Sequence, residues 1–137
     1  MLTPREQPPR EEELVAHVRA WLNLLADGRL ADACAQLDEP NAYGVSWTPA
    51  AIMQALSDTY GPDSRFRREH PQGPAFSRVE HATGNGHASV VAFEDESGYS
   101  VEHDVPLNGS YSDLTAQVEF RWRGASLAFI LHDLHVM

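Results

Sequence analysis

The apolar residues of this chain change their spacing partway along it, from a period near 3.6 residues to a period of two. In the N-terminal half they recur every three or four positions, as at Leu14, Val18, Leu22 and Leu25, which is the spacing of one helix face. After Phe76 they alternate with polar residues, which is typical of strands. Helices followed by successive strands predict an α+β domain with the helices on one face of an antiparallel sheet.

Three helices are expected before the strands. The first begins at Glu11 and ends at Gly28, which suits a left-handed C-terminal cap. A shorter second helix follows and stops at Pro40. The third begins after Thr48, whose hydroxyl can cap it, with Pro49 in the first helical position.

Five strands are expected in the second half, separated by glycine- and asparagine-containing segments that suit hairpin turns. Residues 1–10 contain three prolines and few apolar groups, so we expect a flexible arm followed by a single domain over residues 11–137. The expected strands are Phe76–Thr83, His87–Asp95, Tyr99–Leu107, Leu114–Arg123 and Ala125–Val136.

Composition restricts the classes of partner. A length of 137 residues fits one domain, and a net charge of −10 opposes nucleic-acid binding because phosphates are repelled. The single cysteine, Cys34, fits a reducing compartment. There is no apolar segment near the N-terminus to act as a secretory signal and no run of roughly 18 apolar residues to span a membrane. We therefore expect a cytoplasmic protein that contacts neither nucleic acid nor membrane.

The stretch "LVAHVRAWLNLLADGRLADACAQLDEP" places a long helix, an Asp-Gly corner and a shorter helix in succession. Together with the later helix and strands, it resembles the opening of the NTF2-like (cystatin-like, SnoaL-like) superfamily, and the resemblance covers residues 11–137. It implies a curved sheet that wraps a helix into a cone with a pocket, and many members dimerise through the sheet. Enzymes, ligand carriers and interaction modules share this cone, so the resemblance implies no single activity.

The strand Leu114–Arg123 alternates, and its apolar face would line the cone. If Arg123 and Gly124 form a two-residue turn, Trp122 pairs with Ala125 and, further along, Leu114 pairs with Asp133. Directly paired residues share a face, so Asp133 and His135 would enter the apolar hollow. His132 would point to the other side, and a turn one residue longer would reverse these assignments.

His103 shares the apolar face of its strand, and it forms a tentative catalytic set with Asp133 and His135. A carboxylate that orients an imidazole can make it an acid or base near neutral pH. The alternative is a hydrogen-bonded core histidine and two solvated residues at the rim. His132 and His135 would face opposite sides, so we expect no metal site, and no cofactor.

Several other residues are candidates for contacts. Arg65, Arg67 and Arg68 could clamp an anion or pair with the protein's own acidic surface. An outward apolar strip on the last strand, formed by Ala128, Ile130, Leu134 and Val136, predicts a homodimer through the outer sheet face. The residues expected to contact a ligand are Tyr43, Trp47, Tyr60, Val118, Phe120 and Phe129.

Two functional interpretations follow. The first is a non-catalytic binding module that holds a small hydrophobic ligand in the cone or a protein partner on its surface. The alternative is an enzyme similar to SnoaL and ketosteroid isomerase, doing acid/base proton transfer on a hydrophobic small molecule, with Tyr43 or Tyr60 donating to an oxyanion. The catalytic aspartate of those enzymes has no matching motif here, which weakens the alternative.

Overall fold

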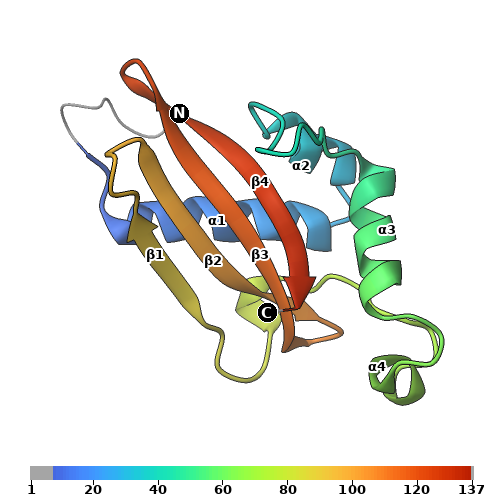
Figure 1. Cartoon of the computed structure of the whole chain (residues 1–137). Coiled ribbons are helices and arrows are strands. Elements are labelled where there is room, and N and C mark those ends of the chain that lie inside the picture. Colours follow the sequence, from blue (N-terminus) through green and yellow to red (C-terminus); the bar gives the residue numbers. More distant parts are fainter. Residues whose placement is uncertain (1–7, 137) are drawn as a thin grey trace.

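A computed structural model describes residues 8–136, so most of the expected N-terminal arm lies outside the described residues. The fold is α+β, and its four strands form one open antiparallel sheet in the order β1-β2-β3-β4 (Figure 1). Its elements are α1 (Glu11–Ala26), α2 (Leu30–Ala35), α3 (Pro49–Thr59), α4 (Arg65–Glu69), the 3-10 turn η1 (Val79–His81), β1 (Ala88–Ala92), β2 (Gly98–Leu107), β3 (Ser110–Arg123) and β4 (Ser126–Val136).

The helices form where local signals favour them. In α1 the apolar stripe is buried and three glutamates occupy the first turn, where negative charge complements the helix dipole. In α3 the hydroxyl of Thr48 accepts a hydrogen bond from the backbone N–H of Ala51 at 3.1 Å, as expected of an N-cap. The expected number of three helices was wrong, because a short fourth helix, α4, capped by Ser64, follows α3 in a segment where no helix was expected.

The number of strands was also wrong. The segment Phe76–Thr83 contains η1 and joins the sheet only through two isolated bridges, Phe76 to Leu107 and Thr83 to Ser110. The other four expected strands are present. β2 and β3 are joined at Asn108 and Gly109, both of which have positive φ, so this turn requires residues that tolerate the left-handed region.

All of the described helices leave one face of the sheet uncovered. Figure 1 views the sheet from this side, with α1 crossing behind it and α2 and α3 beside β4. We call the side that α1 covers the core face and the open side the outer face. The core lies between α1 and the sheet, and Trp21 of α1 is fully buried there with its indole N–H donating to the carbonyl of Ala33 at 2.8 Å. Each such buried large apolar side chain contributes about 1.5–3 kcal/mol.

The pairing of β3 with β4 differs from the expected register in two ways. Gly124 and Ala125 form the turn, so Trp122 lies opposite Leu127 rather than Ala125. This displacement by two residues leaves every side chain on its expected face. A β-bulge then follows: Val118 pairs with Leu131 but Gln117 pairs with Asp133, which leaves His132 as an extra residue in β4. Beyond the bulge, every face assignment in β4 is reversed.

Candidate functional site

The apolar hollow predicted from the sequence is filled by α1. Val118, Phe120 and Phe129 are at most 3% exposed and belong to the core cluster. The ring of Phe129 lies 4.7 Å from the ring of His17 and 6.0 Å from that of Trp21, both on α1. These three predicted ligand contacts are therefore core residues, and burial lowers the pKa of the adjoining His17 imidazole.

His103 is fully buried on the core face, as predicted, and both of its ring nitrogens have partners. The Nε of Arg19 donates to Nε2 at 3.0 Å, and Nδ1 lies 2.7 Å from the carbonyl oxygen of Asp104. Because an arginine Nε always carries its proton, Nε2 must accept, so the proton is on Nδ1 and is donated to the carbonyl. Burial lowers the pKa of His103, which favours this neutral form. The geometry is that of a hydrogen-bonded core histidine.

The prediction that Asp133 and His135 face the apolar hollow was wrong. The bulge at His132 turns both onto the outer face, where they pair with Gln117 and Thr115. They do contact each other, with Nδ1 of His135 3.1 Å from a carboxylate oxygen of Asp133. The side chain of His135 is 36% exposed and that of Asp133 is 46% exposed. The sheet separates them from His103, so the three candidate catalytic residues do not form one site.

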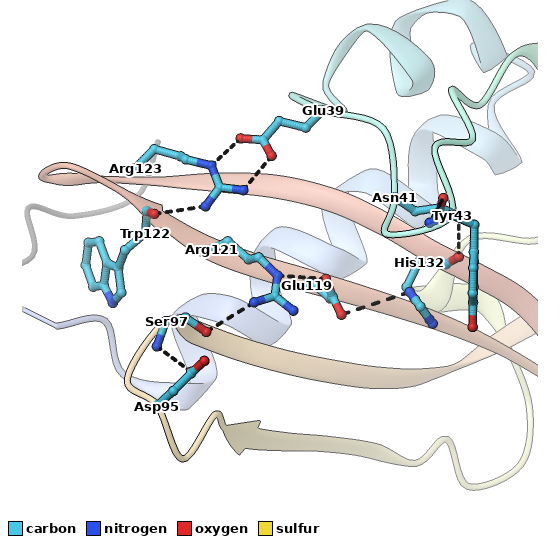
Figure 2. Close-up of polar contacts among 10 residues, drawn as sticks. All are labelled: Glu39, Asn41, Tyr43, Asp95, Ser97, Glu119, Arg121, Trp122, Arg123 and His132. Carbon is cyan, nitrogen blue, oxygen red and sulfur yellow. Dashed lines mark hydrogen bonds and ion pairs between the residues drawn. The ribbon is translucent and has the colours of Figure 1, made fainter.

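The outer face instead carries a chain of polar contacts, which we call the outer-face network (Figure 2). At its centre the Nε of Arg121 donates to Glu119 at 3.0 Å, and Nη1 of the same guanidinium donates to the hydroxyl of Ser97 at 3.1 Å. The backbone N–H of Ser97 donates to Asp95, and the second carboxylate oxygen of Glu119 lies 4.0 Å from Nδ1 of His132. These side chains come from the β1–β2 turn, β3 and β4, so the network crosses the sheet.

The arginine at the centre of this network is also held by an aromatic ring. The guanidinium carbon of Arg121 lies 4.4 Å from the ring centroid of Phe93, a distance typical of a cation–π contact. Sequence reasoning did not identify Arg121 or Glu119 as site residues. The signal was the alternation of β3, which placed a row of polar residues opposite the apolar face.

The segment of residues 38–47 closes the free edge of β4, and Trp47 belongs to this closure. Asp38 exchanges two hydrogen bonds with Phe129: its N–H donates to the carbonyl, and its carboxylate accepts from the N–H. The side chains of Asn41 and Trp47 each donate to a β4 carbonyl at 2.9 Å. Trp47, predicted to line a ligand pocket, thus fastens this segment to the sheet.

Tyr43 projects from the same segment at the margin of the outer face. Its side chain is 76% exposed, and its ring lies 5.4 Å from that of His132 (Figure 2). Nearby, Glu39 forms a bidentate pair with Arg123, both contacts at 2.6 Å, and this hydrogen bonding lowers the pKa of the Glu39 carboxyl. Tyr43, predicted as a ligand contact, is therefore available to a partner on the surface rather than in an interior pocket.

Tyr60 lies away from both regions, in contact with α4. It is buried, its hydroxyl donates to Asp113 at 2.7 Å, and burial together with that carboxylate raises its pKa. A groove of about 320 Å³ opens beside it, lined in part by Phe66 and Val136. Two α4 arginines are already engaged: Arg65 pairs with Glu69, and Arg67 donates to the carbonyl of Tyr60. The Arg65–Glu69 pair fits the alternative of pairing with the protein's own acidic residues, whereas Arg67 contacts a backbone carbonyl.

The apolar strip that suggested a homodimer through the outer face is not exposed. Ala128, Ile130 and Leu134 are each 3% exposed, and only Val136 is open to solvent. Leu134 pairs with Ala116 and faces the core because of the bulge. Ala128 and Ile130 do lie on the outer face, but they are buried there. The basis for predicting that dimer is therefore removed.

The fold and this face define an α+β domain whose antiparallel sheet leaves one side free of the described helices. Residues 69–137, which include all four strands, match the family model described as Domain of unknown function (DUF7668), and the chain belongs to this family. No curated protein and no solved structure matches the chain. Over residues 8–136, no helix is long and apolar enough to cross a membrane. The same residues contain no group of three or more metal-binding side chains placed to hold an ion.

Proposed function

We propose that this protein is a non-catalytic binding module that engages a protein partner through the outer face of its sheet. The observation that carries the proposal is the outer-face network: a face without helix cover displays Arg121 in a fixed orientation, with Tyr43 projecting beside His132. Tyrosine and arginine are enriched among the residues that dominate binding energy at protein interfaces.

The network also lowers the cost of association. A long arginine side chain normally loses about 0.5–1.5 kcal/mol of rotamer freedom when a partner immobilises it. Arg121 is already held by Glu119, Ser97 and the ring of Phe93, so little of that freedom remains to be lost. Its guanidinium is partly exposed, which leaves it able to meet a carboxylate or carbonyl of the partner.

The other interpretations have less support. A small hydrophobic ligand would need the space that α1 fills against Val118, Phe120 and Phe129. An acid/base enzyme would use His135 with Asp133, which do touch, but they lie partly exposed on the outer face rather than in the apolar interior. Membership of the NTF2-like superfamily is also a proposal, supported by the α1–α2 corner at Gly28 and the meander of antiparallel strands.

The test compares variants of the outer face with a variant elsewhere. Immobilised protein would be used to capture partners from a lysate of the source cell, and each captured protein would be purified and titrated by calorimetry. Tyr43→Ala should weaken binding at least about tenfold, because an exposed interface tyrosine is lost. Arg121→Lys should weaken it as well, because lysine keeps the charge but loses the planar fork.

The matched control is Met53→Ala, which truncates an exposed apolar residue on α3. It should bind as tightly as the unaltered protein. A partner whose affinity is unchanged by both outer-face substitutions, or reduced by Met53→Ala instead, would contradict the proposed surface.

A further inference from the structure

The two edges of the sheet are treated differently. The segment of residues 38–47 closes the edge of β4, where Asp38, Asn41 and Trp47 all hydrogen-bond to the backbone of the strand. β1 lies at the opposite margin of the sheet, where β2 is its one strand neighbour among the described residues. In Figure 1 the N-terminal end of α1 extends past β1, but behind the sheet rather than along the edge of the strand. An uncovered edge strand is a template for pairing with another strand.

The hydrogen bonds around β1 show which of its backbone groups are open. The N–H of Asp104 donates to the carbonyl of His87, and the N–H of Phe93 donates to the carbonyl of Gly98, so residues 87, 89, 91 and 93 point toward β2. Backbone groups alternate along a strand. Ala88, Val90 and Ala92 therefore point their N–H and C=O groups away from the sheet. No described residue hydrogen-bonds to these outward groups.

We propose that this edge pairs with the same edge of a second copy of the chain, in antiparallel orientation. Centring the two-fold axis at Val90 places Val90 opposite Val90 of the second copy and Ala88 opposite Ala92 of the second copy. All three outward-pointing residues then find a partner, which gives up to about six backbone hydrogen bonds. The proposal concerns the edge of β1 and is independent of the function proposed for the outer face.

The side chains along this edge suit self-pairing. Natural edge strands commonly avoid association by carrying lysine or proline, whereas β1 has the sequence Ala-Ser-Val-Val-Ala. Val91 is 60% exposed on the outer face, and in this register it lies beside Ser89 of the second copy, which covers part of its apolar surface.

Charge also favours the antiparallel arrangement. β1 is followed by an acidic turn containing Glu94, Asp95 and Glu96, and it is preceded by Gly86 and His87. The two-fold axis places the acidic turn of each copy beside the uncharged glycine and the imidazole of the other copy. The two acidic turns therefore lie at opposite ends of the interface, which limits repulsion between chains that each carry a charge of −10.

The closed edge of β4 limits the assembly to two copies. A two-fold interface uses the same surface on both chains, and it ends there when no second free edge is available. Sedimentation of the whole chain at rising concentration should therefore show a change from 15.2 kDa to twice that mass and no larger species.

Val90→Pro tests the edge itself. The N–H of Val90 points away from β2, so proline removes a hydrogen bond of the interface while the β1–β2 ladder keeps its own. The variant should stay monomeric at every concentration with an unchanged circular dichroism spectrum, and Tyr43→Ala should dimerise as the unaltered protein does. A dimer that survives Val90→Pro overturns the proposal.

Cysteine cross-linking tests the register without depending on proline. In a Cys34→Ser background, Val90→Cys places two sulfurs across the axis at a Cα separation of about 5.5 Å, which a disulfide can span. Ala92→Cys faces Ala88 of the second copy and has no sulfur opposite it. Oxidation should therefore cross-link the first variant and not the second. Equal cross-linking of both variants, or an unaltered chain that remains monomeric at the highest soluble concentration, overturns the proposal.

Discussion

Asn41 connects the segment of residues 38–47 to the sheet, and its removal gives the sharpest stability prediction. The side chain is 7% exposed and satisfies three backbone groups. Its Oδ1 accepts from the N–H groups of Tyr43 at 3.0 Å and Val45 at 2.9 Å, while its Nδ2 donates to the carbonyl of His132 at 2.9 Å. Asn41→Ala deletes all three hydrogen bonds at once.

The expected cost follows from these contacts. A net hydrogen bond contributes about 1 kcal/mol, and a buried group left unpaired costs about 1–3 kcal/mol. Tyr43 and Val45 are exposed, so water can reach their N–H groups, and the expected loss in free energy of unfolding is about 2–3 kcal/mol for Asn41→Ala. Asn41→Asp keeps both acceptor contacts, but its second carboxylate oxygen replaces the Nδ2 donor and faces the carbonyl oxygen of His132. This repulsion between two buried acceptors should make its loss at least about as large as that of Asn41→Ala.

Urea denaturation followed by circular dichroism measures both losses through the transition midpoint, provided that the slope is unchanged. Asn85→Ala, a substitution in an exposed loop, is the control and should stay within about 0.5 kcal/mol of the unaltered protein. A loss below about 1 kcal/mol for either variant would show that this residue does not fasten the segment as argued.

Three further predictions concern His103, two glycines and one ion pair. Burial lowers the pKa of His103 from 6.5, so the imidazole binds a proton more readily in the unfolded chain than in the folded one. The contribution of His103 to the free energy of unfolding is therefore full above pH 6.5 and is lost as the pH drops below that value. Urea denaturation across a pH series should show this loss, and it should be less steep in His103→Gln. In Gly98→Ala the new Cβ would overlap the carbonyl oxygen of Phe120 in β3, so the free energy of unfolding should fall by more than about 4 kcal/mol in the same assay. Gly124 has open space around it, so Gly124→Ala should lose only about 1–2 kcal/mol, which is what a positive φ of 66° costs a non-glycine residue. Glu39→Gln removes the exposed ion pair between Glu39 and Arg123 and should lower the free energy of unfolding by at most about 1 kcal/mol. A loss that does not shrink in added salt would contradict the surface position of this pair.

Features encoded by local periodicity could be predicted from the sequence. The buried stripe of α1, the Thr48 cap of α3 and the alternation of β3 all follow from residues a few positions apart. The burial of His103 followed from the same alternation in β2. The α4 helix could not be predicted from periodicity, because its five residues are too few to repeat a helical apolar pattern, although Ser64 caps it and Phe66 packs on Tyr60.

The placement of the candidate site depended on longer-range pairing. The predicted faces of β4 were correct up to Leu131. The turn at Gly124 and Ala125 shifted the register by two residues, which leaves each side chain on the same face. One extra residue at His132 then reversed the remaining positions, since side chains alternate with a period of two. This one bulge is the reason why the interior location predicted for Asp133 and His135 was wrong.

The energetics of the core explain why β4 bulges at His132. Uninterrupted alternation after Leu131 would place Asp133 and His135 in the apolar interior and Leu134 on the outer face. Burying polar groups without partners costs about 1–3 kcal/mol each even by the lower, mutational estimates, and exposing Leu134 would forfeit about 1.5–3 kcal/mol of burial. The bulge allows both Leu131 and Leu134 to be buried in the core and places Asp133 and His135 on the outer face. The carbonyl of the extra residue, His132, accepts a hydrogen bond from Asn41. Two leucines three residues apart in a period-two strand are therefore the sequence signal for this bulge, because both can reach the core only if one residue between them is unpaired.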